Sequence, residues 1–72
     1  MELIRHFKSK RYSNDCMRYT YITLVQLDDS LYLFTKTDKL VGYLDNTETY
    51  TELFTDRKAA EKYTQKIIDE LL

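Results

Sequence analysis

Residues 18 to 37, RYTYITLVQLDDSLYLFTKT, restrict the fold of this chain more than any other stretch. They are rich in the β-branched and aromatic residues that favour strands, and only the polar cluster at 28–30 interrupts them. A connection this short joins antiparallel strands, because a parallel crossover needs about a dozen residues. The stretch therefore predicts a β-hairpin with strands at 18–27 and 31–37.

The same residue types continue to residue 54 and predict further strands at 39–44 and 49–54. Thr37-Asp38 is a weak break between strands, and DNTE at 45–48 is a predicted turn. ELIRHF at 2–7 is a candidate first strand. The polar segment KSKRYSNDC at 8–16 has no apolar periodicity, so a loop is predicted there. These short connections predict an antiparallel β-meander of three to five strands.

The C-terminal segment FTDRKAAEKYTQKIIDELL predicts an amphipathic helix. Its apolar stripe, at spacings of three and four, consists of Ala60, Tyr63, Ile67 and Leu71, widened by Ala59 and Ile68. Thr55 or Asp56 can cap the first turn, so the helix is expected over 56–71. One helix on one face of a meander gives an α+β fold, β-β-β-β-α, and the whole chain, 1–72, is expected to form one small domain.

The register of the hairpin decides which side chains the helix covers. A two-residue turn at Asp28 and Asp29 places Leu24 opposite Leu33 and separates the aliphatic side chains from the aromatic ones. A three-residue turn instead places Leu24 opposite Phe34. The first register is expected, because a stripe of alanine and isoleucine packs well on an aliphatic face. It leaves four aromatic residues on the face away from the helix: Tyr19, Tyr21, Tyr32 and Phe34.

No motif in the sequence predicts catalysis or a cofactor. A nucleophilic Ser, Cys or Thr would need a base beside it, and the chain has a single histidine, His6. A pair of Cys16 and His6 is conceivable, but neither lies in a recognisable motif. DNTETYTE lacks the glycine that a calcium loop requires, and Gly42 stands alone, which excludes a phosphate-binding glycine loop. We therefore expect no enzyme activity, small-molecule substrate, cofactor or metal.

The seven tyrosines and three phenylalanines favour a binding function, because tyrosine is enriched at protein interfaces. We expect a non-enzymatic regulator or inhibitor, of the kind that phages and other mobile elements carry, that occupies the surface of a partner protein or of a second copy. The predicted binding residues are the four aromatic residues above, with an acidic rim of Asp28, Asp29, Asp45 and Glu48. Such a rim would steer a basic partner.

An alternative is nucleic-acid binding through the sheet and the basic N-terminal segment. Residues 1 to 18 carry five arginines or lysines against two acidic residues, whereas 19 to 56 carry two lysines against seven. The candidate contacts are Lys8, Lys10, Arg11 and Arg18. They could neutralise only a few phosphates, so weak and salt-dependent binding is expected, and protein binding is the first prediction.

Residues 19 to 72 resemble two DNA-associated domains in pattern. The run from the hairpin into LFTDRKAAEKY is similar to the three-strand-plus-helix DNA-binding domain of some tyrosine recombinases, in which a strand ending in Phe meets a Thr-capped helix. The same run resembles a WGR domain, but this chain has no tryptophan. DNA binding by such a domain would need a basic strand face, which the strands predicted here lack, so the sequence identifies no family.

Hydropathy bears on the location of the protein. No apolar run approaches the roughly 18 residues of a membrane span, and MELIRHFKSK has no hydrophobic segment long enough for a signal peptide. The sequence predicts a cytoplasmic protein without a membrane segment.

Overall fold

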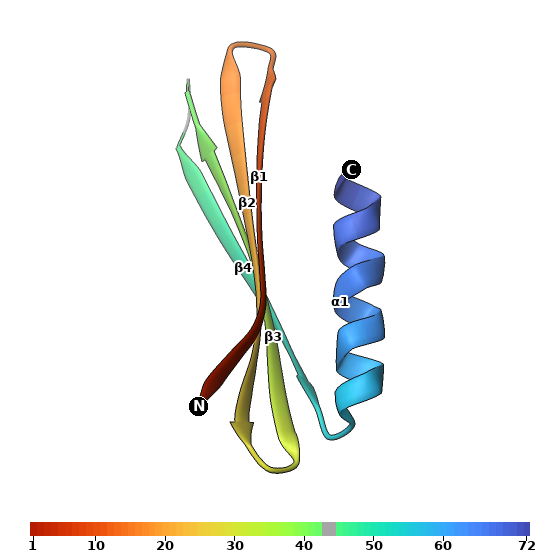
Figure 1. Cartoon of the computed structure of the whole chain (residues 1–72). Coiled ribbons are helices and arrows are strands. Elements are labelled where there is room, and N and C mark those ends of the chain that lie inside the picture. Colours follow the sequence, from red (N-terminus) through yellow and green to blue (C-terminus); the bar gives the residue numbers. More distant parts are fainter. Residues whose placement is uncertain (43–44) are drawn as a thin grey trace.

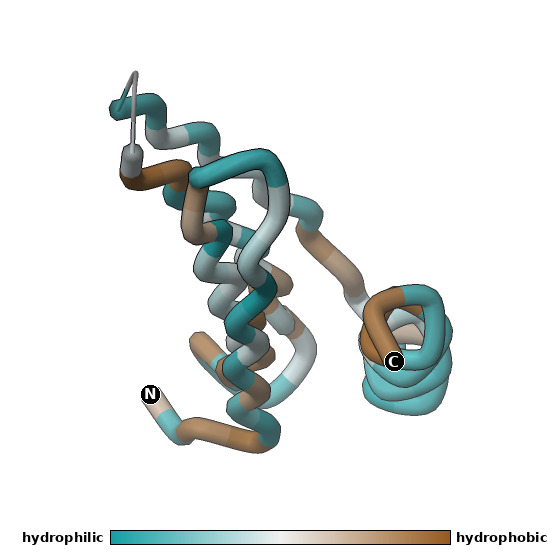
Figure 2. The backbone as a smooth tube through the Cα atoms, turned by 90° about the horizontal axis from the view of Figure 1, so that it is seen from above, coloured by the Kyte–Doolittle hydropathy of each residue, from teal (hydrophilic) through white to brown (hydrophobic). Residues whose placement is uncertain are grey.

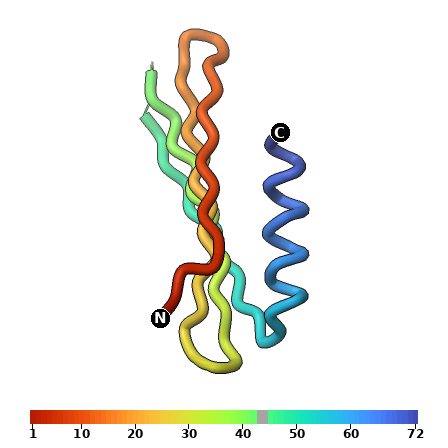
Figure 3. Tube along the Cα trace, viewed as in Figure 1, coloured from red at the N-terminus to blue at the C-terminus, as the bar shows by residue number. Residues whose placement is uncertain are grey.

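The computed structural model describes residues 1–42 and 45–72. Strands β1 (Glu2–Ser13), β2 (Cys16–Asp28), β3 (Leu31–Val41) and β4 (Asn46–Phe54) form one antiparallel sheet in the order β1-β2-β3-β4, and helix α1 (Arg57–Leu71) follows. The sheet is long and twisted, and the helix lies along one of its faces (Figure 1). The trace in Figure 3 passes from each strand to its neighbour without a crossover. The predicted α+β meander with one C-terminal helix is confirmed.

Helix α1 begins within one residue of the predicted start. Asp56 is the N-cap, and its carboxylate accepts a hydrogen bond from the backbone N–H of Ala59 at 3.2 Å. The ion pair between Arg57 and Glu61 in the first turn raises the pKa of Arg57, because the carboxylate accepts a hydrogen bond from its Nε.

The buried stripe of α1 is centred one residue beyond the predicted one. Ala60, Thr64 and Ile68 are buried, and the predicted Tyr63, Ile67 and Leu71 are partly buried beside them. Ala59 is exposed. Thr64 fits the core because its hydroxyl donates to the carbonyl of Ala60 at 2.8 Å, so this buried hydroxyl has a hydrogen-bond partner.

The core lies between α1 and the two central strands. Ile22 and Leu24 of β2 and Phe34 of β3 are fully buried, and Tyr32 is 6% exposed. Phe34 packs edge to face against Tyr63 of the helix, with ring centroids 5.0 Å apart. In Figure 2, which looks down the helix, its hydrophilic residues lie mainly on the side away from the sheet. The helix therefore seals one face of the sheet only.

The register between β2 and β3 differs from the expected one. Leu24 is opposite Phe34 and Val25 is opposite Leu33, as in the alternative register, because the register shifts between Gln26 and Asp28 and adds a residue to β2. The preferred two-residue register is therefore wrong. Consequently Tyr32 and Phe34 lie under the helix and not on the face away from it.

The segment predicted as a loop at 8–16 is mostly strand. β1 extends to Ser13 and pairs with β2 along its length. Asn14 and Asp15 form the connection with φ of 51° and 62°, the left-handed conformation that a two-residue hairpin turn requires at both positions. Asn and Asp tolerate this conformation better than most residues. This hairpin places a basic strand at the edge of the sheet.

The strand boundaries in the second half of the chain also differ from the predicted ones. β3 runs through Thr37 and Asp38 without interruption, and β4 begins at Asn46, inside the predicted turn DNTE. The last residues of the predicted strand 39–44 lie outside the described residues. Among the residues that are described, no helix combines the length and the apolar character needed to cross a membrane.

Candidate functional site

The face of the sheet away from α1, here called the open face, is not covered by any described element (Figure 1). Alternate residues of each strand point to it, and the register aligns them in rows across the sheet. From one end to the other, the rows are Leu3–Val25–Leu33–Leu53, His6–Thr23–Thr35–Thr51, Lys8–Tyr21–Thr37–Thr49, Lys10–Tyr19–Lys39–Thr47 and Tyr12–Met17–Val41. The open face thus has an aliphatic end and a tyrosine–lysine end, separated by threonines.

Two tyrosines of β2 form the centre of the tyrosine–lysine end. The rings of Tyr19 and Tyr21 are nearly parallel, with an interplanar angle of 11° and centroids 6.4 Å apart. Lys8 Nζ lies 5.9 Å from the ring centroid of Tyr21, and Lys10 Nζ lies 5.8 Å from that of Tyr19. Tyr19 has Lys10 of β1 as its neighbour on one side and Lys39 of β3 as its neighbour on the other. Each ring therefore has a lysine ammonium group over it.

The charge of the open face is of one sign. Its rows contain Lys8, Lys10 and Lys39, and no Asp or Glu is among the described residues that form them. The acidic residues of the strand interiors, such as Asp38 and Glu48, point to the helix side. A molecule with formal charge -1 thus presents a surface of net positive charge on one face.

The predicted nucleic-acid contacts divide between the two faces. Lys8 and Lys10 lie on the open face, as described above. Arg11 and Arg18 are opposite each other on the helix side, where Arg11 Nη2 donates to the carbonyl of Leu71 at 3.4 Å. Lys39, which the sequence reasoning left out, joins the first pair. Lys39 shares the open face with Tyr19 because odd-numbered residues of β2 and β3 point to the same side. The sequence does not show this until the register of the two strands is known.

The predicted protein-binding residues also separate. Tyr19 and Tyr21 are on the open face, whereas Tyr32 and Phe34 are part of the core. Placing these four residues on one face was wrong, because the extra residue in β2 reverses the sides of β3 relative to the expected register.

The four predicted acidic residues lie at three separate places in the sheet. Asp28 and Asp29 are at the β2–β3 hairpin, where Asp28 Oδ1 accepts from the N–H of Ser30 at 2.9 Å. Asp45 precedes β4 at the opposite end of the sheet, and its Oδ1 accepts from the N–H of Gly42 at 3.3 Å. Glu48 is opposite Asp38 on the helix side. Glu48 therefore lies on the helix side and not beside the open face, whereas the other three lie at the two ends of the sheet.

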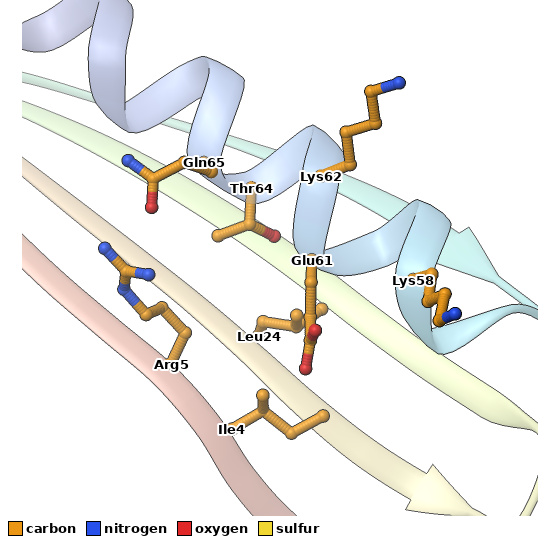
Figure 4. A pocket seen from close by; sticks show the side chains of 8 residues that line it. All are labelled: Ile4, Arg5, Leu24, Lys58, Glu61, Lys62, Thr64 and Gln65. Atoms are coloured by element: carbon orange, nitrogen blue, oxygen red, sulfur yellow. The ribbon is translucent and has the colours of Figure 1, made fainter.

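A groove of about 510 Å³ lies on each side of α1, on the helix side of the sheet. The groove beside β1 has an apolar floor of Ile4 and Leu24, into which Glu61 points, while the amine of Lys62 points away from the sheet (Figure 4). Arg5 of β1 also lines this groove (Figure 4). The groove beside β4 is lined in part by Tyr50 and other aromatic residues.

Further chemistry is sparse among the described residues. His6 is on the open face opposite Thr23, whereas Cys16 is on the other face and seven residues from Thr23 along β2, so the structure does not bring this predicted pair together. No group of three His, Cys, Asp or Glu residues that could hold a metal ion occurs in the described part of the chain. The hydroxyl of Tyr50 donates to the carboxylate of Glu52, which raises the pKa of Tyr50 above its usual range.

Comparisons with protein-family models, with curated proteins and with solved structures found no match. What the chain does must therefore be argued from the open face and its chemistry.

Proposed function

We propose that the protein binds single-stranded nucleic acid across its open face. The observation that carries this proposal is the pairing of two neighbouring tyrosine rings with a lysine beside each: Tyr19 with Lys10, and Tyr21 with Lys8. Bases stack on aromatic side chains, and lysines neutralise the phosphates between them. The open face supplies both kinds of group at neighbouring positions.

A single strand fits these groups better than a duplex does. Stacking on a tyrosine requires an exposed base face, and in a duplex the base faces are stacked on one another. The threonines beside the tyrosines offer hydroxyl groups that both donate and accept hydrogen bonds, for example Thr37 and Thr49, whose Oγ1 atoms are 3.5 Å apart. They suit contacts to bases of any sequence. We therefore propose binding with little sequence preference.

The ranking of the two functions changes because of β1. Protein binding ranked first in the sequence analysis since only two lysines lie in residues 19 to 56 and no strand face looked basic. With 8–16 mostly in β1 and its turn, Lys8 and Lys10 join Lys39 on one strand face. The objection that no strand face is basic therefore no longer holds, and no described Asp or Glu lies in the rows of this face to attract a basic protein partner. We propose that the protein acts as a small cytoplasmic binding protein and not as an enzyme.

Matched lysine variants test the role of the open face. We expect fluorescence anisotropy with labelled oligothymidylate to show a log–log salt slope of about -2 for three lysine contacts. Lys8→Gln/Lys10→Gln should reduce that slope by about 1.4, since each lost phosphate contact removes about 0.7. The control, Lys62→Gln/Lys66→Gln on the exposed part of α1, changes the net charge equally. Equal losses in both variants would mean attraction by overall charge, and the open face would not be the site.

Tyrosine variants test stacking separately from charge. Tyr19→Ser/Tyr21→Ser should weaken binding by at least about tenfold at constant salt, with an unchanged salt slope, because stacking contributes about 1–3 kcal/mol per base. Single strands should bind more tightly than a duplex of the same length. Preference for the duplex, or no binding by the parent at about 0.15 M salt, would contradict the proposal.

A protein partner remains a second candidate because of the aliphatic end of the open face. Leu3 and Leu53 are 58% and 59% exposed, and Val25 and Leu33 lie between them in the same row. Exposed apolar clusters of this kind mark protein contacts when they are large enough. Leu3→Ser/Leu53→Ser should then abolish capture of the partner and leave nucleic-acid binding unchanged.

A further inference from the structure

The two edge strands of the sheet differ in how well they are protected against pairing with another strand. β1 carries Arg5, Lys8, Lys10 and Arg11, and its register shifts at a bulge next to Leu3. Lysines and bulges on an edge strand are the usual devices that prevent pairing with another chain. β4, NTETYTELF, has no lysine, arginine or proline, and its pairing with β3 is regular along its length. Its unpaired N–H and C=O groups are thus accessible to a further strand.

A groove adjoins this unprotected edge. It lies between β4 and α1, has a volume of about 510 Å³, and takes part of its lining from Phe34, Tyr50, Tyr63 and Ile67. Tyr50 is 49% exposed. The lining also includes the charged side chains Lys36, Asp38 and Glu48. The groove beside β1 receives the carboxylate of Glu61 between its apolar residues (Figure 4). Apolar surface and open hydrogen-bonding groups therefore meet at the β4 edge.

We propose that β4 pairs antiparallel with β4 of a second copy of this chain, about a two-fold axis at Thr51. The paired strands would join two sheets into one of eight strands. Even-numbered residues of one copy are then opposite even-numbered residues of the other. Both helices therefore lie on one side of the joined sheet, and both open faces lie on the other side. The inference does not depend on nucleic-acid binding, although a dimer of this kind would place two tyrosine–lysine ends on one surface.

The side chains of β4 favour this register. With the axis at Thr51, Tyr50 of each copy is opposite Glu52 of the other copy, and the tyrosine hydroxyl that already donates to its own Glu52 can reach either carboxylate. Glu48 of each copy is opposite Phe54 of the other copy, and the two Thr51 residues are opposite each other. An axis at Tyr50 would place Glu48 opposite Glu52, and like charges directly opposite destabilise a strand pair. These pairs favour an axis at Thr51 over one at Tyr50. An axis at Thr49 would also avoid like-charge pairs, because it places Tyr50 opposite Glu48.

Disulfide cross-linking distinguishes the registers, because the chain has a single cysteine that can be removed. In a Cys16→Ser background, Thr51→Cys should form an interchain disulfide readily, since opposite residues have Cβ atoms about 5 Å apart. Thr49→Cys is the matched control on the same strand and face. Its two copies would be separated by four residues of strand, about 14 Å, and should not cross-link. Equal cross-linking of the two variants, or preferential cross-linking of Thr49→Cys, would overturn the inference.

Mass measurement tests the dimer in the unmodified chain. Light scattering should give twice the 8.7 kDa of one chain at sub-millimolar concentration. Thr51→Lys should return the mass to that of a monomer, because it brings two lysines together at the axis, whereas Thr47→Lys, at the end of the same strand, should not. A monomer at all concentrations, or open-ended oligomers of the parent, would overturn the proposed pairing.

Discussion

Adjacent residues of β2 show how different the two faces of the sheet are. Ile22 and Leu24 are fully buried under α1, whereas Tyr21 and Thr23, their neighbours in the chain, are partly exposed on the open face. The first face is held by packing against one helix, and its residues are replaceable only by others of similar size and polarity. The second is free of that constraint, so its tyrosines and lysines can be present for binding. Paired substitutions, one on each face, can test this contrast.

The largest difference is expected between Leu24→Asp and Thr23→Asp. The first places a charge in the core, which costs more than the total stability of a domain this small, so the protein should be unfolded at 25 °C. The second should change the free energy of unfolding by about 1 kcal/mol or less, because Thr23 is partly exposed. Circular dichroism melts of the two variants measure the difference. A folded Leu24→Asp protein would contradict the assignment of the covered face.

A smaller difference is expected between Tyr32→Ser and Tyr21→Ser. Tyr32 is 6% exposed and belongs to the core, so its truncation should cost about 3–4 kcal/mol. Tyr21→Ser should cost about 1 kcal/mol or less, because Tyr21 is partly exposed, and should affect chiefly the proposed nucleic-acid binding. Urea denaturation followed by far-UV circular dichroism gives both values. Similar losses in the two variants would place Tyr21 in the core as well, and the open face would then not be a free binding surface.

The parts of the fold that were predictable from sequence are those with a strong periodic signal. The helix carries an apolar stripe at spacings of three and four, and its start and length were predicted closely. The central strands were recognised from their β-branched and aromatic residues. Thr64 was not predicted as a core residue because a polar side chain is usually exposed. Its hydroxyl donates a hydrogen bond to the carbonyl of Ala60, and the sequence alone does not show this bond.

β1 was only partly predicted because most of its residues are exposed and not packed under the helix. An edge strand beyond the helix needs neither an apolar face nor alternation, so Lys8, Lys10 and Arg11 looked like a loop. The register of the central hairpin failed for another reason. The extra residue between Gln26 and Asp28 involves no glycine, and a bulge without glycine leaves little signal in a sequence. Both errors concern the open face, so the candidate site was less predictable than the fold.

The smallest effect is expected for two substitutions of threonine by valine, which has nearly the same shape. Thr20 is 3% exposed on the covered face, and its Oγ1 donates to Asp38 Oδ1 at 2.7 Å. Thr20→Val removes that donor and leaves a partly buried carboxylate with the more distant Lys36, 3.9 Å away. We expect a loss of about 1–2 kcal/mol in the free energy of unfolding, as for hydrogen bonds to charged groups.

Thr35→Val is the matched substitution on the open face, on the neighbouring strand. Thr35 is partly exposed and points away from the helix, and valine favours strands at least as well as threonine, so stability should change by no more than about 0.5 kcal/mol. Urea midpoints of the two variants at pH 7 give the comparison, provided that both share the denaturant slope of the parent. A loss at Thr35 equal to that at Thr20 would show that threonines of the open face are also structural. In that case their hydroxyls would be committed within the sheet and not available to a bound strand.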